Sequence, residues 1–138
     1  MRNIKFRGKD MFSGKWLYGA YIPTEFTQWR EPSIFDGHHR AEVDGTTIGQ
    51  YTGYKDADGK EIYEGDVLQS FISDKTNRGV VEFRDGAWQI WDRTKDKMSE
   101  CWMLLDWTLF RIERVKVVGN IHDNPELMEG KNDKQRNT

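Results

Sequence analysis

Five acidic residues crowd one stretch in the middle of the chain. They are Asp56, Asp58, Glu61, Glu64 and Asp66. Clustered carboxylates are the ligands that hard divalent cations prefer, and a bound cation activates water for hydrolysis. The stretch therefore suggests a metal-dependent enzyme, which would bind Mg²⁺, Mn²⁺ or Ca²⁺ tightly through Asp56, Asp58 or Asp66.

The spacing of these acids nevertheless favours turns. A calcium loop of the EF-hand type that began at Asp56 would need a glutamate where Val67 stands, and helices on both sides. The flanking residues have strand composition, and Asp58-Gly59 suits a two-residue hairpin loop because both residue types tolerate positive φ. Asp66 is expected to accept hydrogen bonds from nearby backbone N–H groups. We therefore predict no metal and no cofactor, and the enzyme stays an alternative.

Other sets of catalytic residues are absent from the sequence. It contains no glycine-rich phosphate loop, no Gly-x-Ser-x-Gly turn and no Cys-x-x-Cys pair. The single cysteine, Cys101, has no histidine or basic residue beside it to activate a thiol, and it suits a small buried position. His38 and His39 are adjacent, so in a strand they would point to opposite sides and make a poor metal pair. No catalytic residue is predicted.

The N-terminal segment carries a second candidate site, made of basic and aromatic residues. A basic strand face with aromatic rings can contact phosphates and stack on bases. A solvent-exposed strand whose Lys and Arg side chains discourage edge-to-edge pairing would have the same composition. Nucleic-acid binding is therefore an alternative function, and it requires the basic side chains to share one open surface. The candidate residues are Arg2, Lys5, Arg7, Lys9, Lys15 and Trp16.

The elements that position these residues are predicted to be mainly β. Residues 4–7 alternate apolar and basic side chains, and residues 15–22 form a second strand-like run, so the two predict an N-terminal hairpin. Residues 25–44 contain Pro32 and isolated apolar side chains, and they are expected to form a long loop or a short excursion beside the sheet. A strand over residues 47–51 is expected to break at Gly53.

Strands at short spacing follow, as in a small, strongly bent antiparallel barrel of the SH3-like type. Residues 67–72 predict a strand, residues 73–79 a polar loop, and Arg84-Asp85-Gly86 the turn of a hairpin. Residues 98–110 fit either a helix or a buried strand, and a strand near residues 101–104 followed by a helical turn is favoured.

The chain is expected to close with a strand and a short helix. The strand covers residues 115–121, and the helix is expected to start with Asp123 or Asn124 as its cap and Pro125 in its first turn. The fold class is thus mainly β, or β-rich α+β. The predicted parts are residues 1–61 with the hairpin and a variable loop, residues 62–130 with the barrel and helix, and a flexible tail over residues 131–138.

The central stretch resembles the hallmark of the YopX family of bacteriophage and prophage proteins. The opening around residues 4–9 and 14–16, the run 79–83 and the closing run 118–127 resemble the family in the same order. Residues 23–44 and 92–114 have no clear counterpart, and Tyr54 replaces a usually aliphatic residue. The residues that carry the resemblance are Tyr51, Thr52, Gly53, Lys55, Asp56, Gly59, Lys60, Ile62, Tyr63, Glu64, Gly65, Asp66, Gly119, Asn120, Asn124 and Pro125.

The resemblance implies a small, phage-borne, β-rich protein, and it carries no catalytic residue over to this chain. A net charge of −2 gives no general attraction to nucleic acid or to an anionic membrane. No apolar run approaches the ~20 residues that span a bilayer, and the N-terminus lacks the apolar core of a signal peptide, so the cytoplasm of a bacterial host is expected.

The favoured function is that of a non-catalytic phage accessory protein that binds a macromolecule. The partner would be a host or phage protein, or a second copy of the chain. Six tryptophans in a polar sequence suggest aromatic interface anchors. The candidates for such anchors are Trp16, Trp29 and Trp107.

Overall fold

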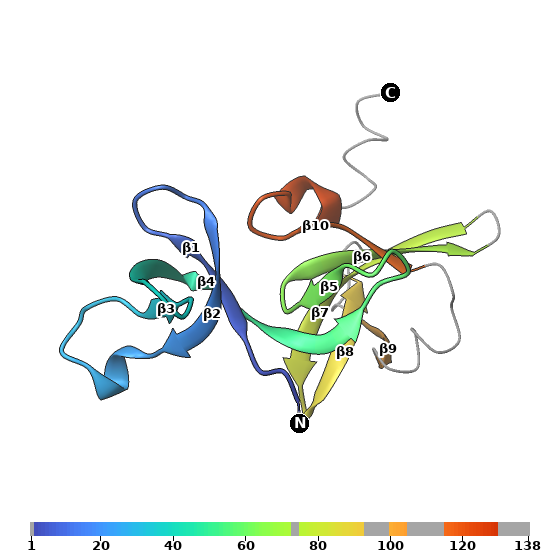
Figure 1. Cartoon of the computed structure of the whole chain (residues 1–138). Helices are drawn as coiled ribbons and strands as arrows, with labels where there is room; N and C mark the ends of the chain where they lie inside the picture. Colours follow the sequence, from blue (N-terminus) through green and yellow to red (C-terminus); the bar gives the residue numbers. More distant parts are fainter. Residues whose placement is uncertain (1, 73–74, 93–99, 105–114, 130–138) are drawn as a thin grey trace. The chain divides into compact units, whose positions relative to one another are not determined.

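The computed structural model describes residues 2–72, 75–92, 100–104 and 115–129 (Figure 1). The chain is mainly β, as predicted, and its helices are short 3-10 turns. The elements in order are β1 (Phe6–Asp10), β2 (Trp16–Ile22), η1 (Thr24–Phe26), β3 (Ser33–Phe35), β4 (Arg40–Lys55), β5 (Glu61–Tyr63), β6 (Asp66–Ile72), β7 (Lys75–Arg84), β8 (Ala87–Asp92), β9 (Glu100–Leu104), β10 (Val115–Asn120) and η2 (Pro125–Met128).

The chain divides into two compact units. The first covers Met1–Gly53 and the second Tyr54–Thr138. The division falls within β4, whereas the sequence analysis placed a boundary after Glu61. The hairpin around Asp58-Gly59 therefore belongs to the second unit.

The first unit is a closed ring of four antiparallel strands. β1 pairs with β2, β2 with β3, β3 with β4, and β4 returns to β1. The predicted hairpin of β1 and β2 is confirmed, with Phe6 opposite Gly19. Inside the ring Ile34 and Val43 are fully buried. Gly8 lies so close to Val43 that an added Cβ would be 3.1 Å from that side chain, so the two strands pack tightly at this point.

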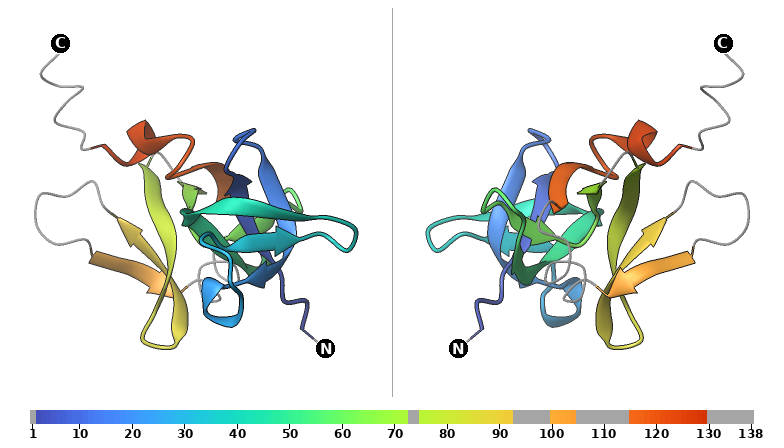
Figure 2. Two further views of the ribbon diagram at one scale, coloured as in Figure 1. Left: turned by 90° about the vertical axis from the view of Figure 1, so that its left-hand side faces the viewer. Right: turned by 90° about the vertical axis from the view of Figure 1, so that its right-hand side faces the viewer.

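Of the two alternatives for residues 25–44, a long loop or a short excursion beside the sheet, the second holds from Ser33 onward. β3 and the start of β4 form a hairpin there, which projects from the rest of the first unit (Figure 2). Its turn is built by Asp36, whose Oδ1 accepts hydrogen bonds from the N–H groups of His38 and His39, each at 2.8 Å. The sequence contains too few apolar residues here for a strand signal, because ring closure with β2 and β4 supplies the backbone partners.

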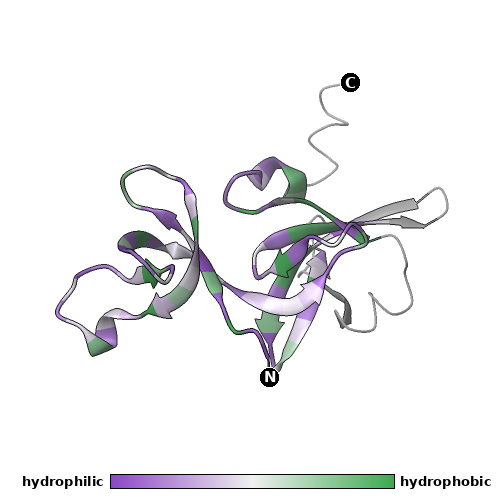
Figure 3. Ribbon diagram, viewed as in Figure 1, coloured by the Kyte–Doolittle hydropathy of each residue, from purple (hydrophilic) through white to green (hydrophobic). Residues whose placement is uncertain are grey.

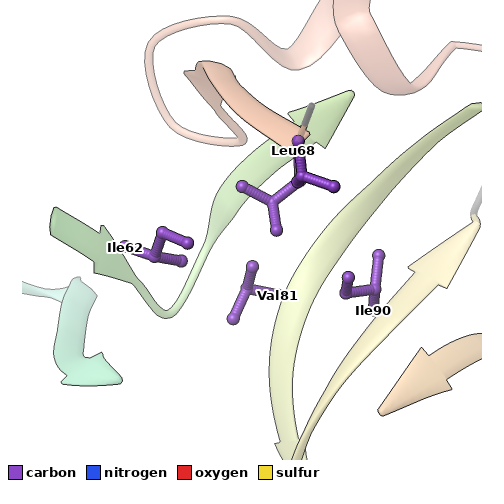
Figure 4. Packing of buried hydrophobic residues seen from close by; sticks show 5 residues of the cluster. Ile62, Leu68, Val81 and Ile90 are labelled. Carbon is purple, nitrogen blue, oxygen red and sulfur yellow. The ribbon is translucent and has the colours of Figure 1, made fainter. Parts of the chain in front are cut away.

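The second unit contains a five-stranded antiparallel sheet in the order β10-β6-β7-β8-β9. The closing strand β10 lies beside β6, the first strand of this sheet in the chain, and the SH3-like barrel stays a prediction. Its core gathers one buried side chain from each of five strands, and Figure 4 labels four of these side chains. The fully buried residues of this core are Ile62, Leu68, Val81, Ile90 and Val115.

The two hairpin turns predicted in this unit have different outcomes. The Asp85-Gly86 turn is confirmed, with φ of 53° and 78° and with Arg84 paired to Ala87. The two-residue loop predicted at Asp58-Gly59 is wrong. The hairpin closes with a hydrogen bond from the Asp56 N–H to the Lys60 carbonyl at 2.8 Å. Within its loop, a turn closes with a hydrogen bond from the Gly59 N–H to the Asp56 carbonyl.

Two further predictions need correction. The polar loop over residues 73–79 is wrong, because β7 begins at Lys75 and pairs with β6 from Ile72 onward. The C-terminal helix lies where it was expected, as the 3-10 turn η2, with Asn124 at its N-cap position and Pro125 in its first turn, but the expected capping bond is not formed.

Several predictions concern residues outside the described part of the chain. The strand near residues 101–104 is confirmed as β9. The helical turn after it, the burial of Cys101, the anchor Trp107 and the tail over residues 131–138 lie outside the residues that the structure describes. Among the described helices, none has the length and apolar composition needed to cross a membrane.

Candidate binding face

The acids of the central stretch are held by structural partners. Asp56 is buried, and its Oδ1 accepts hydrogen bonds from the N–H groups of Asp58 at 2.8 Å and Lys60 at 2.9 Å. Its Oδ2 accepts a third bond, from the N–H of Val117 in β10 at 3.0 Å. The carboxylate therefore closes the β4–β5 hairpin and ties it to β10.

The other acids of this stretch have similar roles. Asp66 is 2% exposed, and its Oδ2 accepts a bond from the Tyr63 N–H at 2.7 Å, as the sequence predicted. Asp58 forms an exposed ion pair with Lys116 at 3.5 Å, and Glu61 accepts a bond from the Tyr63 hydroxyl at 3.2 Å. Within the described ranges, no three His, Cys, Asp or Glu side chains are grouped as metal ligands. Both oxygens of Asp56 and Oδ2 of Asp66 thus accept hydrogen bonds from backbone N–H groups.

The closing motif forms a comparable turn around Asn120. Its Oδ1 accepts bonds from the N–H groups of His122 and Asp123, both at 2.9 Å. The Asn120 N–H in turn donates to Oδ1 of Asn124 at 3.3 Å. A Cβ at Gly119 would lie 2.5 Å from that same oxygen and 2.7 Å from Leu127 Cδ1. The motif thus packs a turn against the end of β10, and a larger residue at Gly119 would have to displace the Asn124 and Leu127 side chains.

Acidic side chains in the first unit build turns by the same device. Oδ1 of Asp10 accepts bonds from the N–H groups of Ser13 and Phe12, and these bonds hold the pKa of this exposed carboxyl below its ordinary 3.8. Bonds from the backbone of His39 and His38 likewise lower the pKa of Asp36. These acids stabilise turns, with Asp10 at the end of β1 and Asp36 just after β3.

The basic residues predicted as a nucleic-acid site are only partly brought together. Arg7 and Lys9 alternate in β1 and so lie on one face of it, and Lys5 directly precedes the strand. Arg7 and Lys9 both contact the ring of Trp16, at 4.6 and 5.5 Å from its centroid. Lys5 lies 5.2 Å from the ring centroid of Tyr51. The β1 face is therefore built from cations packed on aromatic rings.

Two of the predicted basic residues lie outside the strands. Arg2 is exposed and precedes β1, while Lys15 is exposed in the turn before β2. Arg7 is also only 5% exposed, so it stabilises the face rather than reaching into solvent. The open basic surface predicted from Arg2, Lys5, Arg7 and Lys15 is therefore wrong as a set.

The structure continues this face into a row of exposed side chains. Ala20 pairs with Phe35 across β2 and β3, and Phe35 pairs with Arg40 across β3 and β4. The Arg40 guanidinium lies 3.5 Å from the ring centroid of Trp29. Tyr18 precedes Ala20 by two positions on β2 and points to the same side. We call these five residues the aromatic row, in which Tyr18, Phe35 and Trp29 are 47%, 41% and 39% exposed.

The charges around the aromatic row are unequal in sign. Lys9 and Arg40 lie on this side of the ring, and Asp44 and Glu42 are its acids by strand pairing. The Asp44 carboxylate accepts hydrogen bonds from the N–H and the hydroxyl of Thr46, and so it stabilises the turn in which it lies. With Lys5 and Arg7 the cations of this side outnumber the acids. Polar and apolar residues follow one another along the strands of the first unit (Figure 3).

Sequence reasoning identified Trp16 and Trp29 but missed the rest of the aromatic row. Tyr18, Phe35 and Arg40 lie far apart in the chain, and two of them fall in the segment for which a long loop or a short excursion was predicted. The signal that points to them is the run Ser33-Ile34-Phe35 before Asp36-Gly37, a strand ending in a turn.

Comparisons with known proteins agree with the resemblance of the motifs. The family model described as "YopX protein" matches residues 5–129. A solved structure, protein EF1440 from Enterococcus faecalis, is similar with a TM-score of 0.56 and 23% sequence identity, covering 94% of this chain and 100% of that chain. This likeness shows a shared fold. No curated protein matches the sequence.

Proposed function

The chain belongs to the YopX family, and we propose that it is a non-catalytic module that binds another macromolecule through the aromatic row of its first unit. The exposure of this row is the observation that supports the proposal. Tyr18, Phe35 and Arg40 lie on three strands of the ring, Trp29 stacks on Arg40 from the loop before β3, and the three aromatic residues are each more than a third exposed. Aromatic and arginine side chains dominate the affinity of protein interfaces.

The proposal includes a setting and a partner. We place the protein among the accessory proteins of a phage or prophage, in the cytoplasm of the bacterial host. Its partner is a host or phage macromolecule, or a second copy of the chain. The turn roles of the acids support a module without catalysis, because the carboxylates of Asp56 and Asp66 already hold backbone N–H groups.

Partner capture with paired variants tests the proposal. The full chain is immobilised, exposed to bacterial lysate and compared with Tyr18→Ala, which removes a ring of the aromatic row. The control is Tyr21→Ala, because Tyr21 lies on the same strand with its ring 5.4 Å from that of Phe6, on the opposite face. A hot-spot loss of about 2 kcal/mol corresponds to ~30-fold weaker capture.

The expected result is that Tyr18→Ala loses the captured partner while Tyr21→Ala keeps it. Sedimentation of the chain alone tests self-association with the same pair of variants. Equal capture and equal assembly by the wild type and Tyr18→Ala would refute the proposed role of the aromatic row.

A further inference from the structure

The two units contain matching arginine–tryptophan pairs in different electrostatic surroundings. In the first unit Arg40 lies over Trp29 at 3.5 Å, and in the second Arg84 lies over Trp91 at 3.9 Å. Arg84 also pairs with the carboxylate of Glu82 at 3.3 Å, which offsets its charge. Arg40 instead donates to the neutral hydroxyl of Ser33 at 2.6 Å and keeps its full charge. The first pair is therefore suited to an anion.

The aromatic row places this charge beside accessible rings. Arg40 lies between Phe35, its strand partner, and Trp29, which it covers. Lys9 and Trp16 continue the alternation of cations and rings at the other end of the face. A repeat of rings and cations matches a polymer that repeats flat rings and negative charges.

Duplex nucleic acid offers its phosphates to such a face but keeps its bases stacked inside. A single strand offers both phosphates and the open faces of its bases. Acidic proteins offer carboxylates without a regular series of flat rings. From this complementarity of charge and shape we infer that the partner of the aromatic row is single-stranded nucleic acid. This inference rests on the proposed function and names its partner.

The inference predicts a specific salt dependence. Each phosphate neutralised on a single strand contributes about −0.7 to the slope of log affinity against log salt. Contacts from Arg40 and Lys9, with a third from Lys5, predict a slope of roughly −1.4 to −2.1. The chain's net charge of −2 gives no general attraction, so any such slope reports a local site.

Fluorescence anisotropy with a labelled oligothymidylate of about 12 nucleotides tests the inference, since small β-barrels cover ~4–16 nucleotides. The full chain is titrated from low to moderate salt, with a duplex of the same length as comparison. Phe35→Ala is expected to weaken binding about tenfold by removing one stacking ring. Arg40→Gln is expected to weaken binding and to reduce the salt slope by about 0.7.

Two matched variants serve as controls, and the fold of all four variants is checked by near-ultraviolet circular dichroism. Arg84→Gln removes the arginine of the second pair, and Tyr21→Ala removes a tyrosine from the opposite face of β2; both are expected to bind as the wild type. No binding of the oligonucleotide at low salt would overturn the inference, and so would equal losses in Arg40→Gln and Arg84→Gln.

The lysate capture separates the two levels of the argument. In one outcome, the chain does not bind the oligonucleotide but still captures a partner in a way that depends on Tyr18 and survives nuclease treatment. This outcome overturns the nucleic-acid inference and leaves the proposed function in place, with a protein as partner. The absence of both oligonucleotide binding and Tyr18-dependent capture overturns both. Oligonucleotide binding that the row variants weaken and the controls keep supports both.

Discussion

The two units of this chain distribute their apolar side chains in opposite ways. Among the described residues the second unit buries eight apolar side chains and exposes two large ones, whereas the first buries three and exposes eight. A closed ring of four strands has little interior volume, so most of its aromatic residues lie outside. A five-stranded sheet, in contrast, can bury the apolar side chains of one of its faces. The difference teaches that stability is concentrated in the second unit and exposed binding surface in the first.

The largest expected effect tests the core of the second unit. Leu68→Ala removes a fully buried side chain from the cluster in Figure 4. We expect the free energy of unfolding to fall by about 2–5 kcal/mol, as for other buried leucines. Chemical denaturation followed by circular dichroism measures it. Phe35→Ala, in the first unit, is the comparison, and a loss as large as that of Leu68→Ala would contradict the contrast between the units.

Gly119→Ala tests the tight packing of the closing motif. Its Cβ would approach Asn124 Oδ1 to 2.5 Å, so the turn must shift, and we expect a loss of about 1–3 kcal/mol. The urea midpoint reports the change. Gly45→Ala is the control because its Cβ would meet only Pro32, at 3.4 Å. Unchanged stability of Gly119→Ala would show that the turn adjusts without cost.

Asp56→Asn tests the turn role of the central acids. The amide keeps one oxygen for Asp58 and Lys60 but turns an N–H₂ group toward the Val117 N–H, so one buried donor loses its acceptor. We expect a loss of about 1–2 kcal/mol by thermal denaturation. Asp44→Asn is the control, because Oδ1 of Asp44 accepts the hydrogen bonds from the Thr46 N–H and hydroxyl and an amide keeps that oxygen. A metal-dependent enzyme would instead show a stability that Mg²⁺ or Ca²⁺ raises in the wild type and no longer raises in Asp56→Asn.

The smallest expected effect concerns the exposed turn of the β3–β4 hairpin. Hydrogen bonds from the backbone of His39 and His38 lower the pKa of Asp36 in the folded state. The ionised carboxylate therefore stabilises the fold at pH values above its unfolded-state pKa, and this stabilisation is lost as the pH falls through its folded-state pKa. Nuclear magnetic resonance titration is expected to place its midpoint below 3.8. A midpoint at or above that value would contradict the turn geometry.

The sequence predicts the fold more fully than the site. The Asp85-Gly86 turn, the strands on either side of it and the β1–β2 hairpin follow local rules, since turn residues and alternation act over a few positions. The strand at residues 33–35 escaped notice because three residues carry little periodicity, and its partners lie in β2 and in β4. The prediction of a loop over residues 73–79 is wrong for the same reason. Polar residues extend β7 because the neighbouring strand β6 continues to pair with them.

The sequence by itself determined the family, the mainly β class and the turn-forming role of acids such as Asp66, because these depend on residue types at fixed local spacing. Only the tertiary structure decided which side chains share a face. Ring closure brings Tyr18, Phe35 and Arg40 together from separate strands and withdraws Arg7 from solvent. Strand pairing across long sequence separations sets these neighbours, and no local pattern encodes the register of such pairs.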